Sequence, residues 1–202
     1  MKTLYLSDLD GTLLRADATL SRFSKRLLGG LISRGMLFSY ATARSFSSAS
    51  VILRGLDLRL PAITYNGTFC VDAATGKVLA NELFTQGECD ALVGLFAYHH
   101  LFPLVYSLTG GVERVSWLRG SENEGTVRYL AARRGDPRLT GVQDLSQLFA
   151  GGMFYFNLIG EESALAPLAE ALDTLSGVAY TLQRERYGQG VLAEIMLCRA
   201  SK

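Results

Sequence analysis

Two aspartates near the start of the chain have the type and spacing to carry out chemistry. Asp8 and Asp10 follow the apolar run Thr3–Ser7 and stand directly before Gly11. Residues i and i+2 of an extended chain point to the same side. Two carboxylates about 5 Å apart repel by roughly 3 kcal/mol at an effective dielectric near 20. A hard cation such as Mg²⁺ offsets that repulsion, and glycine lets the backbone approach a phosphate closely. The segment therefore predicts a site for Mg²⁺ and phosphate.

The first eighty residues alternate between strand-like and helix-like patterns. Apolar runs at Thr3–Ser7, Met36–Ala41 and Pro61–Tyr65 predict three strands, and Ser21–Arg34 and Ser45–Arg54 predict the helices between them. This alternation, with short links, predicts a Rossmann-like α/β core with a parallel sheet. Open parallel sheets bind ligands beyond the carboxyl ends of their strands. The two aspartates stand at such an end.

The pattern changes at about Leu83. Helical segments now alternate with paired strand-like runs: helices at Gly87–Tyr98, Glu122–Arg134 and Glu161–Leu175, and strands at Leu104–Leu108, Val112–Leu118, Met153–Ile159, Val178–Gln183 and Val191–Leu197, with hairpin turns at Gly110-Gly111 and Gly188–Gly190. We expect residues 83–197 to form an α+β cap domain inserted into the core. The core would then comprise residues 1–82 and resume at residues 198–202.

The first motif resembles that of a known family. Asp8-Leu9-Asp10-Gly11-Thr12-Leu13-Leu14 is similar to the opening motif of the haloacid dehalogenase superfamily, in particular its Cof-type branch (subfamily IIB), whose members carry an α+β cap. The resemblance implies that Asp8 is the nucleophile that forms an aspartyl-phosphate and that Asp10 is the general acid/base. Asp8 and Asp10 would bind Mg²⁺, and Leu9 and Gly11 would line the phosphate site.

The activity implied by this resemblance is a Mg²⁺-dependent phosphatase. Its substrates would be small phosphorylated metabolites, either sugar phosphates or phosphorylated cofactors. Two alternatives stay open: a truncated relative that binds phosphorylated ligands with weak or no turnover, and a phosphoglucomutase-like phosphotransferase that passes the phosphoryl group to a sugar hydroxyl.

Two further segments resemble the same family. Thr42-Ala43-Arg44 follows the second expected strand, where the family places a phosphate-binding threonine. The resemblance assigns Thr42 a catalytic role and all three residues a place at the substrate phosphate. Relatives carry Thr-Gly-Arg, so Ala43 leaves the turn less backbone freedom, and a surface role is the alternative for Arg44. Asn66, at the end of the third strand, is either a substrate-side residue or a simple turn residue.

The last residues resemble the approach to the family's third motif. Lys202 would be its catalytic lysine, which steadies the phosphoryl group. The acidic segment that follows in the family and completes its Mg²⁺ site has no counterpart here. We therefore expect a chain truncated at its C-terminus, with weakened Mg²⁺ binding and with a first strand whose open edge invites self-association.

Composition and charge narrow the partners and the cellular compartment that we expect for the protein. Lys+Arg 20 against Asp+Glu 19 gives a net charge of +1, which argues against a nucleic-acid or membrane-surface partner. The sequence contains no run of 18 apolar residues, the length that a membrane-spanning helix needs. The early aspartates interrupt any signal-peptide core. Three scattered cysteines favour a reducing cytoplasm.

Overall fold

The chain forms two compact units. The computed structural model describes residues 2–184 and 190–200. The first unit holds the described residues up to Glu82 together with Ala200, and the second holds those from Leu83 to Arg199. The return to the first unit comes two residues later than the sequence indicates, because Cys198 and Arg199 belong with the second unit.

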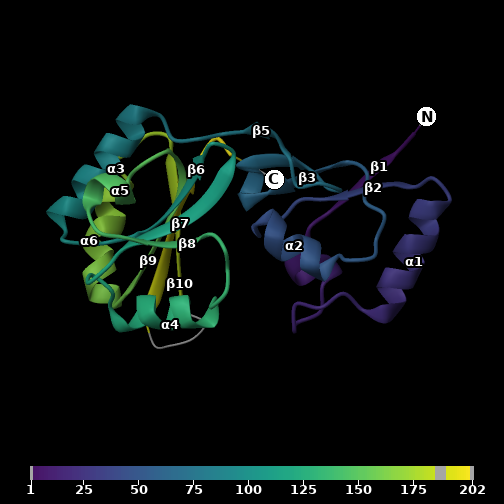
Figure 1. Cartoon of the computed structure of the whole chain (residues 1–202), viewed down its shortest axis with the longest axis horizontal. Helices are drawn as coiled ribbons and strands as arrows, with labels where there is room; N and C mark the ends of the chain where they lie inside the picture. Colours follow the sequence, from purple (N-terminus) through teal and green to yellow (C-terminus); the bar gives the residue numbers. More distant parts are fainter. Residues whose placement is uncertain (1, 185–189, 201–202) are drawn as a thin grey trace. The chain divides into compact units, whose positions relative to one another are not determined.

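The first unit begins with the predicted strand–helix–strand alternation. Its elements are β1 (Leu4–Ser7), α1 (Arg22–Ser33), β2 (Leu37–Tyr40), α2 (Phe46–Ile52) and β3 (Pro61–Thr64). β1 and β2 are parallel, and a parallel bridge between Ala41 and Ile63 continues the pairing toward β3 (Figure 1). The α/β class and the parallel arrangement of the first three strands are confirmed.

Serine side chains fix where both helices begin. The Ser21 hydroxyl accepts a hydrogen bond from the Ser24 N–H at 2.9 Å, and the Ser45 hydroxyl accepts one from the Ser48 N–H at 3.2 Å. Such caps satisfy N–H groups that the first helical turn leaves without intrahelical partners. α2 therefore starts at a defined residue, directly after the segment Thr42-Ala43-Arg44.

Two strands of the first unit were not predicted. β4 (Phe69–Asp72) pairs antiparallel with β3, and β5 (Val78–Asn81) pairs antiparallel with β4. The sequence predicts a turn at Asn66-Gly67 but no strand directly after it. The turn joins two antiparallel strands, which is the connection that this dipeptide favours. The parallel sheet thus gives way to an antiparallel one beyond β3.

The second unit is a six-stranded sheet with the order β10-β11-β9-β6-β7-β8. The bounds are β6 (Leu104–Thr109), β7 (Val112–Leu118), β8 (Leu139–Val142), β9 (Gly152–Gly160), β10 (Val178–Arg184) and β11 (Val191–Leu197), with helices α3 (Gln86–Tyr98), α4 (Glu124–Ala132), α5 (Leu145–Leu148) and α6 (Glu162–Leu172). Every predicted strand and helix of this region is present. β8 and α5 were missed because both are short and lack an apolar run. Most of the turn predicted at Gly188–Gly190 lies outside the described residues.

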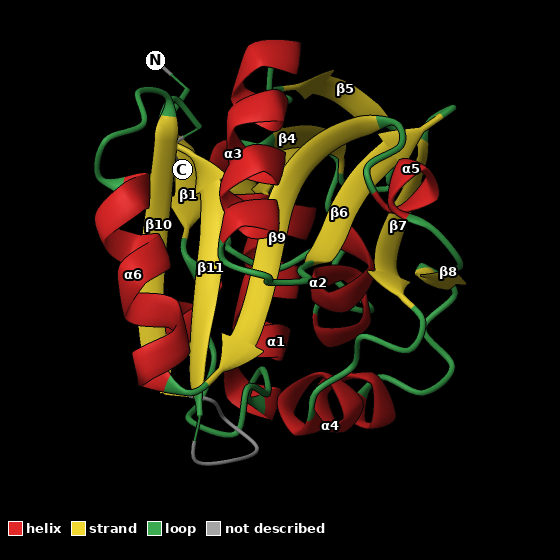
Figure 2. Ribbon diagram, turned by 90° about the vertical axis from the view of Figure 1, so that its left-hand side faces the viewer, coloured by secondary structure: helices red, strands yellow, loops and turns green. Residues whose placement is uncertain are grey.

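The core of this second unit lies between the sheet and two of its helices. Figure 2 shows α3 and α6 lying across one face of the sheet. Phe156 of β9 is fully buried there, with its ring centroid 5.3 Å from that of Phe96 and 5.5 Å from that of Phe84. Aromatic pairs at such distances add to the stabilisation that burial gives. In the described part of the chain, no helix has both the length and the apolar character needed to cross a bilayer.

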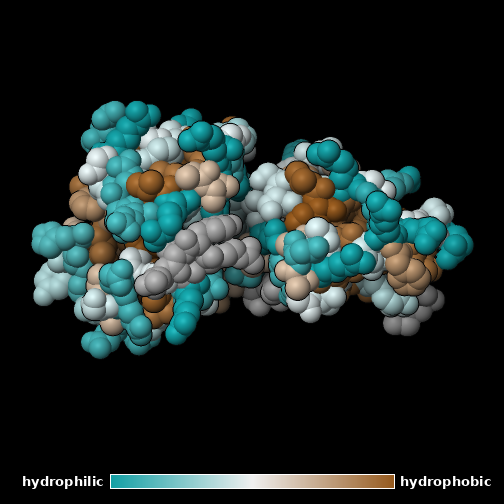
Figure 3. All heavy atoms as spheres, turned by 90° about the horizontal axis from the view of Figure 1, so that it is seen from below, coloured by the Kyte–Doolittle hydropathy of each residue, from teal (hydrophilic) through white to brown (hydrophobic). Residues whose placement is uncertain are grey.

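β1 is a largely exposed strand that carries apolar side chains. Leu4, Tyr5 and Leu6 are 55%, 53% and 50% exposed, and among the described residues β1 pairs only with β2. Figure 3 shows apolar atoms reaching the surface of the first unit between hydrophilic neighbours. Parallel strands are usually covered on both faces, so β1 is an apolar edge strand open to water.

One ion pair links the two ends of the second unit. The Arg199 guanidinium contacts the Glu88 carboxylate at 2.6 Å and donates a hydrogen bond to the Leu83 carbonyl at 2.7 Å. The hydrogen bond from Arg199 is the main cause that holds the pKa of Glu88 below its usual value of 4.5. The pair therefore stabilises the fold above pH 4.5, and this contribution is lost as the pH falls through the lower folded-state pKa.

Arg199→Ala should accordingly lower the free energy of unfolding by about 1 kcal/mol at neutral pH. The difference from the wild type should shrink as the pH is lowered below 4.5, as measured by urea unfolding across a pH series. Arg59→Ala is the matched control, because the Arg59 side chain is 79% exposed, and it should leave stability unchanged. A difference that grows toward acid pH would contradict this account.

Candidate active site

Backbone hydrogen bonds join the carboxyl ends of β1, β2 and β3. The Ala41 N–H donates to the Ser7 carbonyl at 2.9 Å, and the Thr42 N–H donates to the Ile63 carbonyl at 3.0 Å. The Asn66 N–H then donates to the Thr42 carbonyl at 3.0 Å. The loops that follow the three strands therefore meet at one edge of the sheet, where parallel α/β sheets bind ligands.

The loop after β1 is a single wide turn over Leu9–Leu13. The Leu14 N–H closes the turn by donating to the Leu9 carbonyl at 2.9 Å, and Leu9 is fully buried beneath it. Gly11 has a φ of +73°, a left-handed conformation that glycine adopts without steric cost. Asp8 is partly exposed, and its Oδ1 accepts the Leu9 N–H at 2.8 Å. The turn thus anchors Asp8 and carries Asp10 at the surface.

Asp10 forms a bidentate ion pair with Arg44. Nε of Arg44 lies 2.7 Å from Oδ2 of Asp10, and Nη2 lies 2.7 Å from Oδ1. The hydrogen bond with Asp10 raises the pKa of the Arg44 guanidinium. The Arg44 side chain is 21% exposed and that of Asp10 is 49% exposed, so the pair lies at the rim of the site. Arg44 therefore lies beside Asp10 among the candidate site residues, and its contact with an anionic substrate stays a prediction.

The loop after β2 is shaped by Thr42. This residue is fully buried, and its hydroxyl oxygen accepts the Arg44 N–H at 3.1 Å, a local turn typical of threonine. Ala43 is exposed and is not among the residues with positive φ. The glycine that relatives carry at this position is therefore not required here by backbone conformation, and alanine fits.

The loop after β3 holds two adjacent residues in the left-handed region. Tyr65 has a φ of +49° and Asn66 a φ of +54°. The Tyr65 N–H donates to the Arg44 carbonyl at 3.1 Å, and the buried Tyr65 ring packs edge-on against Phe69 with centroids 5.7 Å apart. Asparagine tolerates this conformation better than most residues. Asn66 thus acts as a turn residue that lies beside the Thr42 loop, and a substrate-side role stays a prediction.

Oxygen donors at the end of β1 are of the chemical kind that Mg²⁺ prefers. Mg²⁺ takes one or two carboxylates and retains several waters. Because Arg44 engages both carboxylate oxygens of Asp10, the donors suited to the ion are the Asp8 carboxylate and the Asp10 backbone carbonyl. Within the described ranges, no three His, Cys, Asp or Glu residues are grouped closely enough to hold a metal.

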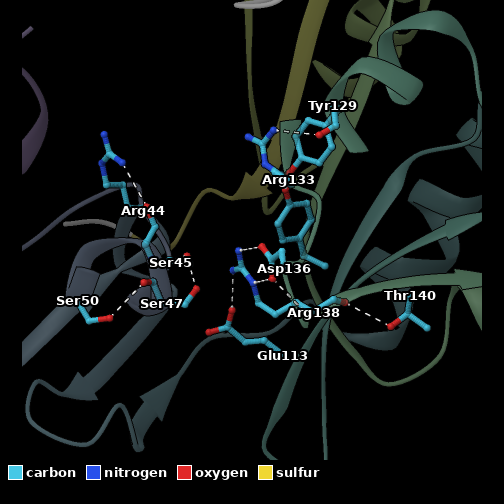
Figure 4. Close-up of polar contacts among 12 residues, drawn as sticks. Arg44, Ser45, Ser47, Ser50, Glu113, Tyr129, Arg133, Asp136, Arg138 and Thr140 are labelled. Atoms are coloured by element: carbon cyan, nitrogen blue, oxygen red, sulfur yellow. Dashed lines mark hydrogen bonds and ion pairs between the residues drawn. The ribbon is translucent and has the colours of Figure 1, made fainter. Parts of the chain in front are cut away.

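Three of the predicted site segments lie on loops that hydrogen bonds join, and one cannot be placed. The three are residues 8–11, residues 42–44 and Asn66, whereas Lys202 lies outside the described residues. Ser48 was missed: its hydroxyl accepts Nη1 of Arg44 at 3.3 Å. The sequence offered one signal for this contact: Ser48 follows Arg44 by four residues at the start of a predicted helix, a spacing that places two side chains on the same helix face. Figure 4 shows Arg44 with Ser45 and Ser47 at the start of α2.

The polar contacts of the second unit involve residues that are not predicted site residues. Arg138 contacts Asp136 at 2.7 Å and Glu113 at 3.1 Å, while Arg133 stacks on the Tyr129 ring at 3.6 Å (Figure 4). The hydrogen bond from Arg138 lowers the pKa of Asp136. These charges are paired within their own unit, and we interpret them as contacts that hold the segments around β8.

Comparisons with known proteins agree with this geometry. The family model described as haloacid dehalogenase-like hydrolase matches residues 5–128. A Buchnera aphidicola subsp. Baizongia pistaciae protein with a provisional phosphatase name is 35% identical over 107 residues, which are 53% of this chain and 40% of that protein. The chain thus spans less than half the length of this relative.

Solved structures match over the whole chain. A haloalkanoate-superfamily phosphatase from Bacteroides thetaiotaomicron is 21% identical with a TM-score of 0.71, covering 100% of this chain and 69% of that one. A Thermotoga maritima protein is 20% identical with a TM-score of 0.73, covering 100% of this chain and 72% of that one. At these identities the likeness shows the fold.

Substitutions at Asn66 test the backbone role assigned to it. Asn66→Gly should leave the free energy of unfolding within about 0.5 kcal/mol of the wild type, because glycine accepts a positive φ. Asn66→Ala should lower it by about 1 kcal/mol, since a Cβ without a local polar group is strained there. Urea unfolding measures both, with Asn81→Ala in extended β5 as the control. Equal stability of the alanine and glycine variants would refute the assignment.

Proposed function

Because the chain belongs to the haloacid dehalogenase-like hydrolase family, we propose that it is a Mg²⁺-dependent phosphatase that acts through an aspartyl-phosphate. One observation carries the proposal: Asp8 and Asp10 leave β1 at the sheet edge where hydrogen bonds join the β1, β2 and β3 loops. Asp8 is assigned as nucleophile, Asp10 as general acid/base, and Thr42 as a phosphate ligand.

The first half of the reaction transfers the phosphoryl group to the protein. A carboxylate oxygen of Asp8 attacks phosphorus, a P–O bond to Asp8 forms, and the bond to the leaving oxygen breaks with its electron pair. Asp10 in its acid form gives a proton to that oxygen. The exposed turn over Leu9–Leu13 supports this assignment, since it leaves Asp10 accessible to a substrate.

The second half releases phosphate. Water attacks phosphorus, its proton passes to Asp10, and the bond to Asp8 breaks, which restores the Asp8 carboxylate. When bound, Mg²⁺ would neutralise charge on the phosphoryl oxygens. Asp8 and the Asp10 carbonyl are the residues that would hold it, and Lys202 is assigned to the phosphoryl group by family resemblance alone.

The substrate class that we propose is a small phosphorylated metabolite, either a sugar phosphate or a phosphorylated cofactor. The second unit lies between Glu82 and Ala200 in the sequence, as expected for an inserted cap domain that carries substrate selectivity. We also propose that the protein resides in the cytoplasm, and the three free cysteines support this proposal.

Asp8→Asn should abolish turnover if Asp8 is the nucleophile. Release of inorganic phosphate from p-nitrophenyl phosphate should require Mg²⁺, and the variant should lose more than about 1,000-fold in kcat/KM, because an amide cannot form the intermediate. Asp57→Asn is the matched control, since the Asp57 side chain is 66% exposed and pairs with Arg59.

The outcomes of this assay separate the alternatives. A wild-type chain that binds phosphate but releases none from any ester would be the non-catalytic relative. A chain that forms a phosphorylated sugar in place of inorganic phosphate would be the phosphotransferase. Turnover that survives Asp8→Asn would contradict both the nucleophile and the mechanism.

We further propose that a second copy of the chain pairs with β1. The strand presents apolar side chains on both faces, with Leu4, Tyr5 and Leu6 each at least half exposed. An open apolar edge of this kind pairs readily with another chain. A two-fold axis would set β1 antiparallel to its copy, so that the same strand of both copies forms the interface and each residue pair occurs twice across it.

Size-exclusion chromatography with light scattering tests this self-association. The wild type should show a concentration-dependent dimer, and Leu6→Lys should shift it to monomer because a charge at the edge opposes pairing. Val112→Lys serves as the control, since Val112 is 60% exposed in the other unit. A wild type that stays monomeric at all concentrations, or equal dissociation of both variants, would exclude pairing through β1.

A further inference from the structure

The geometry around Asp10 points to a role for Arg44 that phosphate binding does not describe. We propose that Arg44 is a positioning residue: its guanidinium holds the Asp10 carboxylate in the orientation that accepts the proton of the attacking water. The inference rests on the proposed phosphatase function and deepens it, because it assigns Arg44 to one half of the reaction.

The contact between the two side chains fixes an orientation as well as a charge. Nε and Nη2 of Arg44 each lie 2.7 Å from a different oxygen of Asp10. Such a planar fork defines the plane of the carboxylate, whereas a lysine ammonium would act as a point charge. The fork uses one acceptor site on each oxygen, of about four that a carboxylate offers. The ion pair with Arg44 therefore does not by itself prevent the same group from accepting a water proton.

Arg44 is itself held from three directions. Its Nη1 donates to the Ser48 hydroxyl at 3.3 Å, and its N–H donates to the Thr42 hydroxyl at 3.1 Å. Its carbonyl accepts the Tyr65 N–H at 3.1 Å. The residue is thus tied to α2, to the β2 loop and to the β3 loop. It transmits their position to a carboxylate 34 residues away in the sequence.

Asp10 needs a partner that fixes its orientation because its side chain lies at the surface. Its side chain is 49% exposed on a turn that contains Gly11, and Arg44 contacts both of its carboxylate oxygens. General-base catalysis requires the base within hydrogen-bond reach of the proton that it removes, and misplacement by about 1 Å can cost roughly 100-fold in rate. The carboxylate form, which Arg44 binds, is the form that acts in the second half of the reaction.

The two half-reactions should therefore respond differently to Arg44→Lys. With p-nitrophenyl phosphate, whose leaving group needs no proton, formation of the aspartyl-phosphate should change less than about 3-fold. Its breakdown should slow by about 10-fold or more. Acid quenching of a rapid-mixing experiment should then show the phosphorylated protein accumulating in the variant. Ser48→Ala, which removes one support of the guanidinium, should give a smaller effect in the same direction.

A double variant separates positioning from a general loss of structure. If Arg44 acts through Asp10, then Arg44→Lys should slow breakdown much less in an Asp10→Asn background than in the wild type. Arg59→Ala, at a 79% exposed arginine, is the control and should change neither step. Thermal unfolding of each variant identifies any that fail to fold. If Arg44→Lys fails to fold, Ser48→Ala takes its place in the comparison with the wild type.

Three results would overturn the inference. Slower formation of the intermediate, together with weaker inhibition by inorganic phosphate, would make Arg44 a phosphate ligand. Additive losses in the double variant would show that Arg44 acts independently of Asp10. A wild type that forms no phosphorylated protein and releases no phosphate would remove the proposed function itself, and the inference with it.

Discussion

Parallel pairing of β1 with β2, continued to β3 by the bridge between Ala41 and Ile63, is the constraint on which the site depends. Parallel strands end at the same edge of a sheet, so three loops distant in sequence emerge together. Hydrogen bonds from Thr42 to Ile63 and from Asn66 to Thr42 then join those loops. Without this register, the acidic motif would be an ordinary exposed turn.

The acidic turn is stabilised by two different means. Asp8 is held locally, since its carboxylate accepts the N–H of the next residue. Asp10 is held from a distance, by Arg44. A nucleophile needs a fixed position close to the strand, whereas an acid/base must reach both a leaving group and a water. The local anchor and the distant ion pair suit the nucleophile role proposed for Asp8 and the acid/base role proposed for Asp10.

The second unit folds around interactions of its own. A six-stranded sheet buries Phe156 beneath α3, and the ion pair of Arg199 with Glu88 closes the unit where the chain enters and leaves it. β1 of the first unit shows the opposite behaviour, with three apolar side chains at least half exposed. Part of the hydrophobic surface left uncovered therefore lies on the strand that delivers Asp8.

Local periodicity and turn residues were enough to predict the strand–helix alternation, the position of Asp8 and Asp10 at a strand end, and the region of the α+β unit. They did not predict that β3 continues into an antiparallel sheet or that Arg44 pairs with Asp10. Both depend on which distant groups become hydrogen-bond partners. Local patterns show that a residue can donate or accept a hydrogen bond, but packing selects its partner.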